Sequence, residues 1–157
     1  MIKYAKMSLF DAPPGSILMH ACNAQGVWGR GIAAEFKHRF PNSYREYVGH
    51  CAKALHGYPF YGVVGRAFIL GPESGKRVAC LVTSYDYRDL DSEETIILQT
   101  ITALEDFCLA WEEVSGGEPI YCNKFNSDLF AVPWEKTEKV LNYFARKYNL
   151  TIIVCEI

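Results

Sequence analysis

The chain has 157 residues, of which 16 are Lys or Arg and 18 are Asp or Glu, so its formal net charge is -2. Hydrophobic residues make up 50% of the chain and charged residues 22%, a balance that excludes an intrinsically disordered protein. These values predict a single globular domain over residues 1–157. The charge provides no basic field that would attract nucleic acid without specificity.

The chain also lacks the signals of a membrane or secreted protein. No apolar run reaches the roughly 18 residues of a membrane span, and the N-terminal stretch has no long apolar core of a secretory signal. The 6 cysteines form no C-x-x-C pair and stand in or beside apolar stretches, which favours buried free thiols over disulfides or a zinc site. We therefore expect a cytoplasmic monomer, also nuclear in a eukaryotic host, with no membrane partner, metal or cofactor.

Hydrophobic periodicity and turn residues predict strands that alternate with helices. The strands are expected at residues 2–6, 16–22, 61–70, 77–85, 119–124 and 150–157. The helices are expected at 32–40, from 42 or 43 to about 55, from 91 until Gly116, and from Pro133 onward. The buried stripe of the third helix is predicted as Ile97, Ile101, Leu104, Cys108 and Trp111, and that of the fourth as Thr137, Leu141, Phe144 and Tyr148. This alternation predicts a layered α/β domain with a largely parallel sheet.

The first of two unusual strand-to-helix joints spans residues 20–32 and contains Gly26, Gly29 and Gly31. Ligands of open α/β sheets lie outside the carboxyl ends of strands. Glycines let the backbone approach a ligand closely, and the following helix offers free N–H groups to an anion. The motif is neither a Walker loop nor G-x-G-x-x-G. It predicts a phosphate-binding loop of another kind, with a simple tight turn as the alternative.

Asn23 and His20 are the polar residues near the end of the strand before this joint. Asn23 either presents its carboxamide to a ligand hydroxyl or is a core amide or turn former. Strand alternation points His20 and Asn23 to opposite faces, so they meet at one site only if the strand ends or twists between them. On composition alone, a single histidine in an apolar strand is more often a hydrogen-bonded core residue than a functional one.

The second joint spans residues 123–133 and brings Asn126, Ser127 and Asp128 to another strand end. The alternative is helix N-capping, a routine use of such residues. However, Pro133 marks the first expected helical position, five residues past Asp128, so capping does not explain this carboxylate. Phe130 supplies aromatic cover beside it.

Three segments in this order resemble the macro domain family, most closely its stand-alone ADP-ribose 1″-phosphate phosphatases. They are residues 17–23 (ILMHACN), 28–33 (WGRGIA) and 126–134 (NSDLFAVPW), with Glu138, Val140 and Leu141 after them. The resemblance runs from the first strand to the last. It implies a three-layer α/β/α sandwich with a mixed, largely parallel sheet that binds an ADP-ribose derivative.

The resemblance also assigns ligand contacts. It places the adenine against Met7, Ser8 and Leu9, where Ser8 replaces the usual acidic residue. It implies that Asn23 contacts the distal ribose, that the first loop covers this ribose and its phosphate, and that the second loop wraps the diphosphate. The remaining implied ligand residues are Ala21, Cys22, Trp28, Gly29, Arg30, Gly31, Ile32, Asn126, Ser127, Asp128, Leu129 and Phe130. Asp128 and Ala131 stand where family members usually have glycine.

The activity implied by the resemblance is hydrolysis of the terminal phosphate of ADP-ribose 1″-phosphate. His20 matches a histidine typical of the phosphatase branch and would act as general base or nucleophile. Asp128 would act as general acid or orienter, and Asn23 would orient the ribose, without a metal. One alternative is an ADP-ribosyl hydrolase that acts on modified protein or nucleic acid. The branch of the family with this activity has a catalytic Asp at the position of Phe130, which counts against the same mechanism here. The other alternative is a non-catalytic ADP-ribose-binding module.

Overall fold

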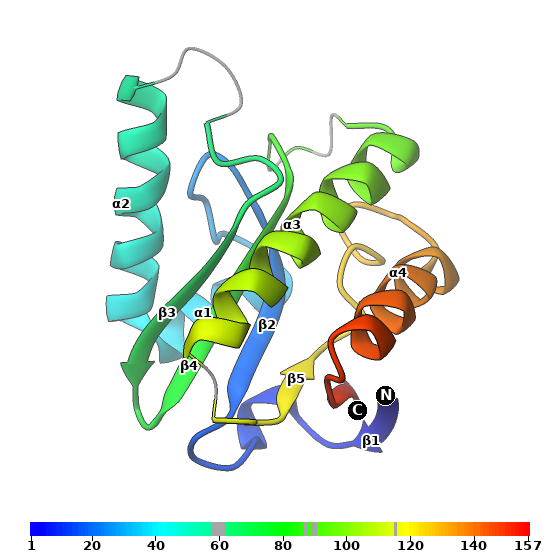
Figure 1. The fold of residues 1–157 in the computed structure, drawn as a ribbon. Coiled ribbons are helices and arrows are strands. Elements are labelled where there is room, and N and C mark those ends of the chain that lie inside the picture. Colours follow the sequence, from blue (N-terminus) through cyan, green and yellow to red (C-terminus); the bar gives the residue numbers. More distant parts are fainter. Residues whose placement is uncertain (58–61, 87, 89–90, 115) are drawn as a thin grey trace.

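The computed structural model describes residues 1–57, 62–86, 88, 91–114 and 116–157, which form one six-stranded sheet with helices on both faces (Figure 1). The strands are β1 (Ile2–Lys6), β2 (Ile17–Asn23), β3 (Ala67–Glu73), β4 (Lys76–Ser84), β5 (Ile120–Cys122) and β6 (Ile152–Glu156). The helices are α1 (Gly31–Arg39), α2 (Pro41–Gly57), α3 (Glu93–Val114) and α4 (Trp134–Lys147), with a short 3₁₀ helix η1 (Leu9–Asp11).

The sheet is mixed and mostly parallel, as predicted. Its strand order is β1-β6-β5-β2-β4-β3, and every described pairing is parallel except that of β3 with β4. The side chains of β2 point alternately to the two faces of the sheet, and both faces are covered by helices, which gives three layers. Leu18 and Cys22 pack on the side of α1 and α2 with Phe36, while Ile17 and Met19 pack on the side of α3 and α4.

Two sequence predictions need correction. The strand expected at 61–70 begins only at Ala67; position 61 lies outside the described residues, and Gly62 and Gly65 hold a turn at positive φ. The predicted stripe of α3 is also rotated, because Ile101 is 37% exposed while Thr100 is fully buried. Thr100 tolerates burial because its hydroxyl donates to the carbonyl of Ile96, 2.7 Å away in the same helix.

Other expectations are confirmed. Thr137, Leu141 and Phe144 form the buried face of α4, with Ala145 beside them, although Tyr148 is half-buried at the helix end. All the cysteines are free and buried. Among the described segments, no helix is both long and apolar enough to cross a membrane.

The sheet topology positions the two unusual joints. β2 pairs in parallel with both β5 and β4, so the carboxyl ends of β2 and β5 lie side by side at one edge. The loop after β2 leads into α1, and the loop after β5 leads into α4. The two joints, far apart in sequence, therefore meet in space as predicted.

Candidate ligand-binding site

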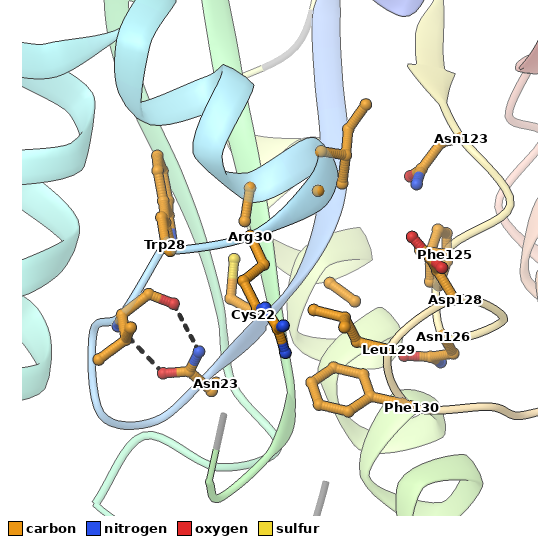
Figure 2. A pocket seen from close by; sticks show the side chains of 16 residues that line it. Cys22, Asn23, Trp28, Arg30, Asn123, Phe125, Asn126, Asp128, Leu129 and Phe130 are labelled. Carbon is orange, nitrogen blue, oxygen red and sulfur yellow. Dashed lines mark hydrogen bonds between the residues drawn. The ribbon is translucent and has the colours of Figure 1, made fainter. Parts of the chain in front are cut away.

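A pocket lies between these two loops, at the carboxyl ends of β2 and β5 (Figure 2). It contains about 710 Å³ of space, part of it open to solvent. The residues that line it are Ala21, Cys22, Asn23, Val27, Trp28, Gly29, Arg30, Gly31, Ile32, Ala33, Asn123, Phe125, Asn126, Asp128, Leu129 and Phe130. The structure thus brings together most of the ligand residues predicted from the sequence.

The N-terminus of α1 opens into this pocket. Arg30 occupies the N-cap position, and its side chain makes no capping hydrogen bond. Gly31 has φ +56°, a conformation that favours glycine. The first N–H groups of the helix therefore face the pocket without a side-chain cap from Arg30, an arrangement suited to an anion.

Asp128 comes from the opposite loop to the same helix end. A Cβ placed on Gly31 would lie 3.5 Å from Asp128 Oδ2. Asp128 is exposed, and Figure 2 shows it with Leu129 and Phe130 on the far side of the pocket from Asn23. Of the described lining residues, Cys22, Arg30 and Asp128 carry ionisable groups.

The carboxamide of Asn23 holds the first loop in shape. Its Nδ2 donates to the carbonyl of Val27 at 2.6 Å, and its Oδ1 accepts from the backbone N–H groups of Gln25 and Val27, both at 3.1 Å. A register shift between Cys22 and Asn23 in the pairing with β4 turns Asn23 into the loop. Both ends of this carboxamide are occupied within the protein.

Asn126 plays the same part for the second loop. It has φ +68°, and its side chain accepts from Thr83 Oγ1 and donates to Thr100 Oγ1, each at 2.9 Å. Its carbonyl accepts from the N–H of Val132 at 2.8 Å, which closes the loop. The Ser127 hydroxyl bonds to the carbonyl of Lys124, and Ser127 is not one of the lining residues.

Asn123 is a lining residue that the sequence analysis did not single out. Its Oδ1 is buried and has no hydrogen-bond partner among the described residues. A buried acceptor without a partner costs free energy that a ligand hydroxyl can recover. The sequence could have indicated this residue, because Asn123 directly follows β5 just as Asn23 ends β2. Val27, Ala33 and Phe125 also line the pocket without having been predicted.

The sequence analysis expected His20 to reach the substrate, and the structure does not bring it to the pocket lining. His20 is fully buried and lies outside the lining. Its ring stacks on Phe36 with centroids 4.0 Å apart and meets Trp28 edge-on at 4.7 Å. Because the imidazole faces the α1 and α2 layer while Asn23 turns into the loop, the two side chains do not meet at one site.

The expected adenine contacts are not part of this pocket either. Met7, Ser8 and Leu9 follow β1, and none of them lines it. Ser8 caps η1 by accepting from the N–H of Phe10 at 3.3 Å, and Leu9 is buried in the core. The first strand lies at the sheet edge beside β6, and β6 and β5 lie between it and β2.

The fold and site together define an α/β/α protein with a ligand pocket at the switch point of a largely parallel sheet. A family model described as "Macro domain" matches residues 19–141. The chain therefore belongs to the macro domain family.

Curated relatives and solved structures agree with this assignment. Proteins named ADP-ribose 1″-phosphate phosphatase are 33% identical in Scheffersomyces stipitis and 36% identical in Candida albicans, each match covering 98% of this chain and 100% of the relative. The macrodomain of Mycobacterium tuberculosis DarG superposes with a TM-score of 0.81 at 21% identity, covering 100% of this chain and 98% of that one. At this identity, the structural likeness establishes the fold alone.

Proposed function

We propose that this chain binds ADP-ribose derivatives and hydrolyses the terminal phosphate of ADP-ribose 1″-phosphate. The observation that carries the proposal is that the N-terminus of α1 and the carboxyl group of Asp128 share one pocket. The names of the curated relatives support the same substrate. Two solved structures with this fold, Thermosipho africanus DarTG and a Trypanosoma brucei macrodomain, are complexes with ADP-ribose.

In this proposal, the terminal phosphate lies against the first N–H groups of α1, with the Arg30 guanidinium beside it. These donors stabilise the charge that develops on the phosphoryl oxygens as water attacks phosphorus. Asp128 donates a proton to the oxygen on C1″ as the P–O bond breaks. General acid catalysis of this kind contributes roughly 10²- to 10⁴-fold. Asn123 accepts a hydroxyl of the distal ribose, while Asn23 shapes the loop.

A non-catalytic ADP-ribose-binding module is the second candidate. His20 is buried outside the pocket lining, so Asp128 is the acidic side chain among the described lining residues and has no histidine beside it to act as a base. A phosphate-release assay on ADP-ribose 1″-phosphate, run beside calorimetry with ADP-ribose, separates the two. Turnover supports the phosphatase, whereas binding without turnover supports the module. Release of ADP-ribose from a modified peptide or oligonucleotide would instead indicate an ADP-ribosyl hydrolase.

A further inference from the structure

Arg30 brings a positive charge to the ligand pocket, and no protein group pairs with it in the described part of the chain. The residue lines the pocket and is exposed. Its side chain makes no capping hydrogen bond to α1 and takes part in none of the ion pairs found among the described residues. Of the described lining residues, Arg30 alone is cationic. The N–H donors of its guanidinium are therefore available to a ligand.

The backbone directs this side chain away from the helix that follows it. Arg30 directly precedes α1 and has extended angles, with φ -144° and ψ 157°. Figure 2 shows its side chain between Asn23 on one side and Leu129 and Phe130 on the other. All of these residues line the same pocket. The guanidinium donors and the first N–H groups of α1 thus open into one space, where both can reach the same anion.

The sign of the charge at this helix end depends on Arg30. The N-terminus of a helix carries roughly half a positive charge, whereas an ionised Asp128 carboxylate, next to Gly31, carries a full negative charge. These two groups alone would make this end of the pocket negative and unfavourable for an anion. The guanidinium of Arg30 makes their sum positive. Asp128 does not neutralise it directly, because the two side chains form no ion pair in the structure.

The substrate and the product of the proposed reaction differ in charge at one place. Both contain the diphosphate, but only ADP-ribose 1″-phosphate has a phosphate monoester on C1″, which carries about -1.5 to -2 charges near pH 7. A guanidinium forms two parallel hydrogen bonds to such a group. A cation that pairs with the terminal phosphate and not with the diphosphate therefore distinguishes the two ligands.

We propose that Arg30 is a specificity-determining residue, whose guanidinium pairs with the phosphate on C1″ and makes the pocket prefer ADP-ribose 1″-phosphate over ADP-ribose. The inference rests on the proposed function and explains how its substrate is distinguished from its product. Loss of the terminal phosphate leaves the guanidinium without a partner again, which favours release of ADP-ribose. Arg30 makes and breaks no covalent bond in this role.

The test compares the affinities of ADP-ribose and ADP-ribose 1″-phosphate for the unmodified chain and for Arg30→Gln. Calorimetry gives both dissociation constants where no phosphate is released during the titration, and KM replaces the constant of the phosphorylated ligand where phosphate is released. We expect Arg30→Gln to weaken binding of the phosphorylated ligand about 10-fold or more, the equivalent of a charge-assisted hydrogen bond, and to change the affinity for ADP-ribose less than about 2-fold.

Two further variants control for charge and for folding. Arg30→Lys keeps the charge but loses the paired donors, so it should recover part of the lost affinity. Arg146→Gln, on α4 and outside the pocket lining, removes the same charge and should leave both affinities unchanged. The urea midpoints of the Arg30 variants should equal that of the unmodified chain, because this exposed side chain does not cap the helix.

Equal losses for the two ligands in Arg30→Gln would overturn the proposal, because they would place the guanidinium at the shared diphosphate. Unchanged affinities for both ligands would overturn it as well. If the unmodified chain prefers the phosphorylated ligand without releasing phosphate, and Arg30→Gln removes that preference, the role of Arg30 stands while the phosphatase function fails. If the chain releases phosphate and Arg30→Gln keeps the preference, the phosphatase function stands while the role of Arg30 fails. The absence of a thermal shift with either ligand would reject both.

Discussion

The carboxylate of Asp128 lies against Gly31, the first residue of α1, with Oδ2 3.5 Å from the position that a Cβ on Gly31 would take. A negative charge next to a helix N-terminus is favourable. In the proposed function, a phosphate of the ligand would bind at this same helix end. Asp128 would then act both as the catalytic acid and as a competitor of the ligand's negative charge.

Asp128→Asn should separate these two roles. We expect kcat for ADP-ribose 1″-phosphate to fall about 100-fold or more, because the amide cannot donate the proton. ADP-ribose should bind as tightly as before or more tightly, because a like charge is removed. Phosphate-release kinetics and calorimetry measure both quantities, with Glu105→Gln on the exposed surface of α3 as the control. Unchanged kcat in Asp128→Asn would remove this residue from the mechanism.

Gly31→Ala should destabilise the protein. Gly31 has φ +56°, and a non-glycine residue in this region costs roughly 1–2 kcal/mol. Gly49→Ala is a matched control, because Gly49 lies inside α2 with open space around its Cβ position. That change should stabilise the protein by about 0.5–1 kcal/mol. Urea unfolding should therefore show effects of opposite sign, and two effects of the same sign would contradict the assigned backbone geometry.

Asn23→Ala tests whether the carboxamide of Asn23 has a structural role. The carboxamide makes 3 hydrogen bonds to the backbone of the first loop and is 6% exposed. Its loss should lower the free energy of unfolding by about 2–3 kcal/mol, because each bond contributes about 1 kcal/mol and the loop groups lose their partner. Asn42→Ala, at an exposed position, should change it by less than about 0.5 kcal/mol. Equal effects of the two substitutions on urea unfolding would contradict the structural role.

The sequence predicted the location of the pocket better than the roles of its side chains. Parallel strands and their loops follow from the alternation of elements, so the meeting of the joints after β2 and β5 could be predicted. The roles of Asn23 and Asn126 could not be predicted. The hydrogen bonds of Asn23 depend on a register shift in the pairing of β2 with β4, and those of Asn126 depend on Thr83 and Thr100, which are distant in sequence. Strand alternation also could not show that His20 is covered by Phe36 and Trp28.

Asp86 should contribute a pH-dependent part of the stability. Hydrogen bonds from Arg88 are the main cause that lowers the pKa of Asp86 to about 2, and Gln25 of the first loop donates to the same carboxylate at 3.1 Å. Because the pKa is lower in the folded state than the unfolded value of about 3.9, the folded protein binds fewer protons. The contribution is complete above about pH 4 and is lost as the pH falls toward 2. The difference in urea midpoint between the unmodified chain and Asp86→Asn should shrink over that range, and a constant difference would contradict this explanation.

Asn123→Leu should change stability and ligand affinity in opposite directions. The buried Oδ1 of Asn123 has no partner in the described part of the chain, so an apolar side chain of similar size removes an uncompensated acceptor. The free energy of unfolding of the empty protein should stay the same or rise by up to about 1 kcal/mol. ADP-ribose affinity should fall about 10-fold, the equivalent of one hydrogen bond to the distal ribose, while the affinity for ADP, which lacks that ribose, stays the same. Asn142→Leu, on α4 away from the pocket, should leave both ligands unaffected. Equal losses for ADP and ADP-ribose in Asn123→Leu would show that Asn123 does not read the distal ribose, because a contact to that sugar cannot weaken the binding of a ligand that lacks it.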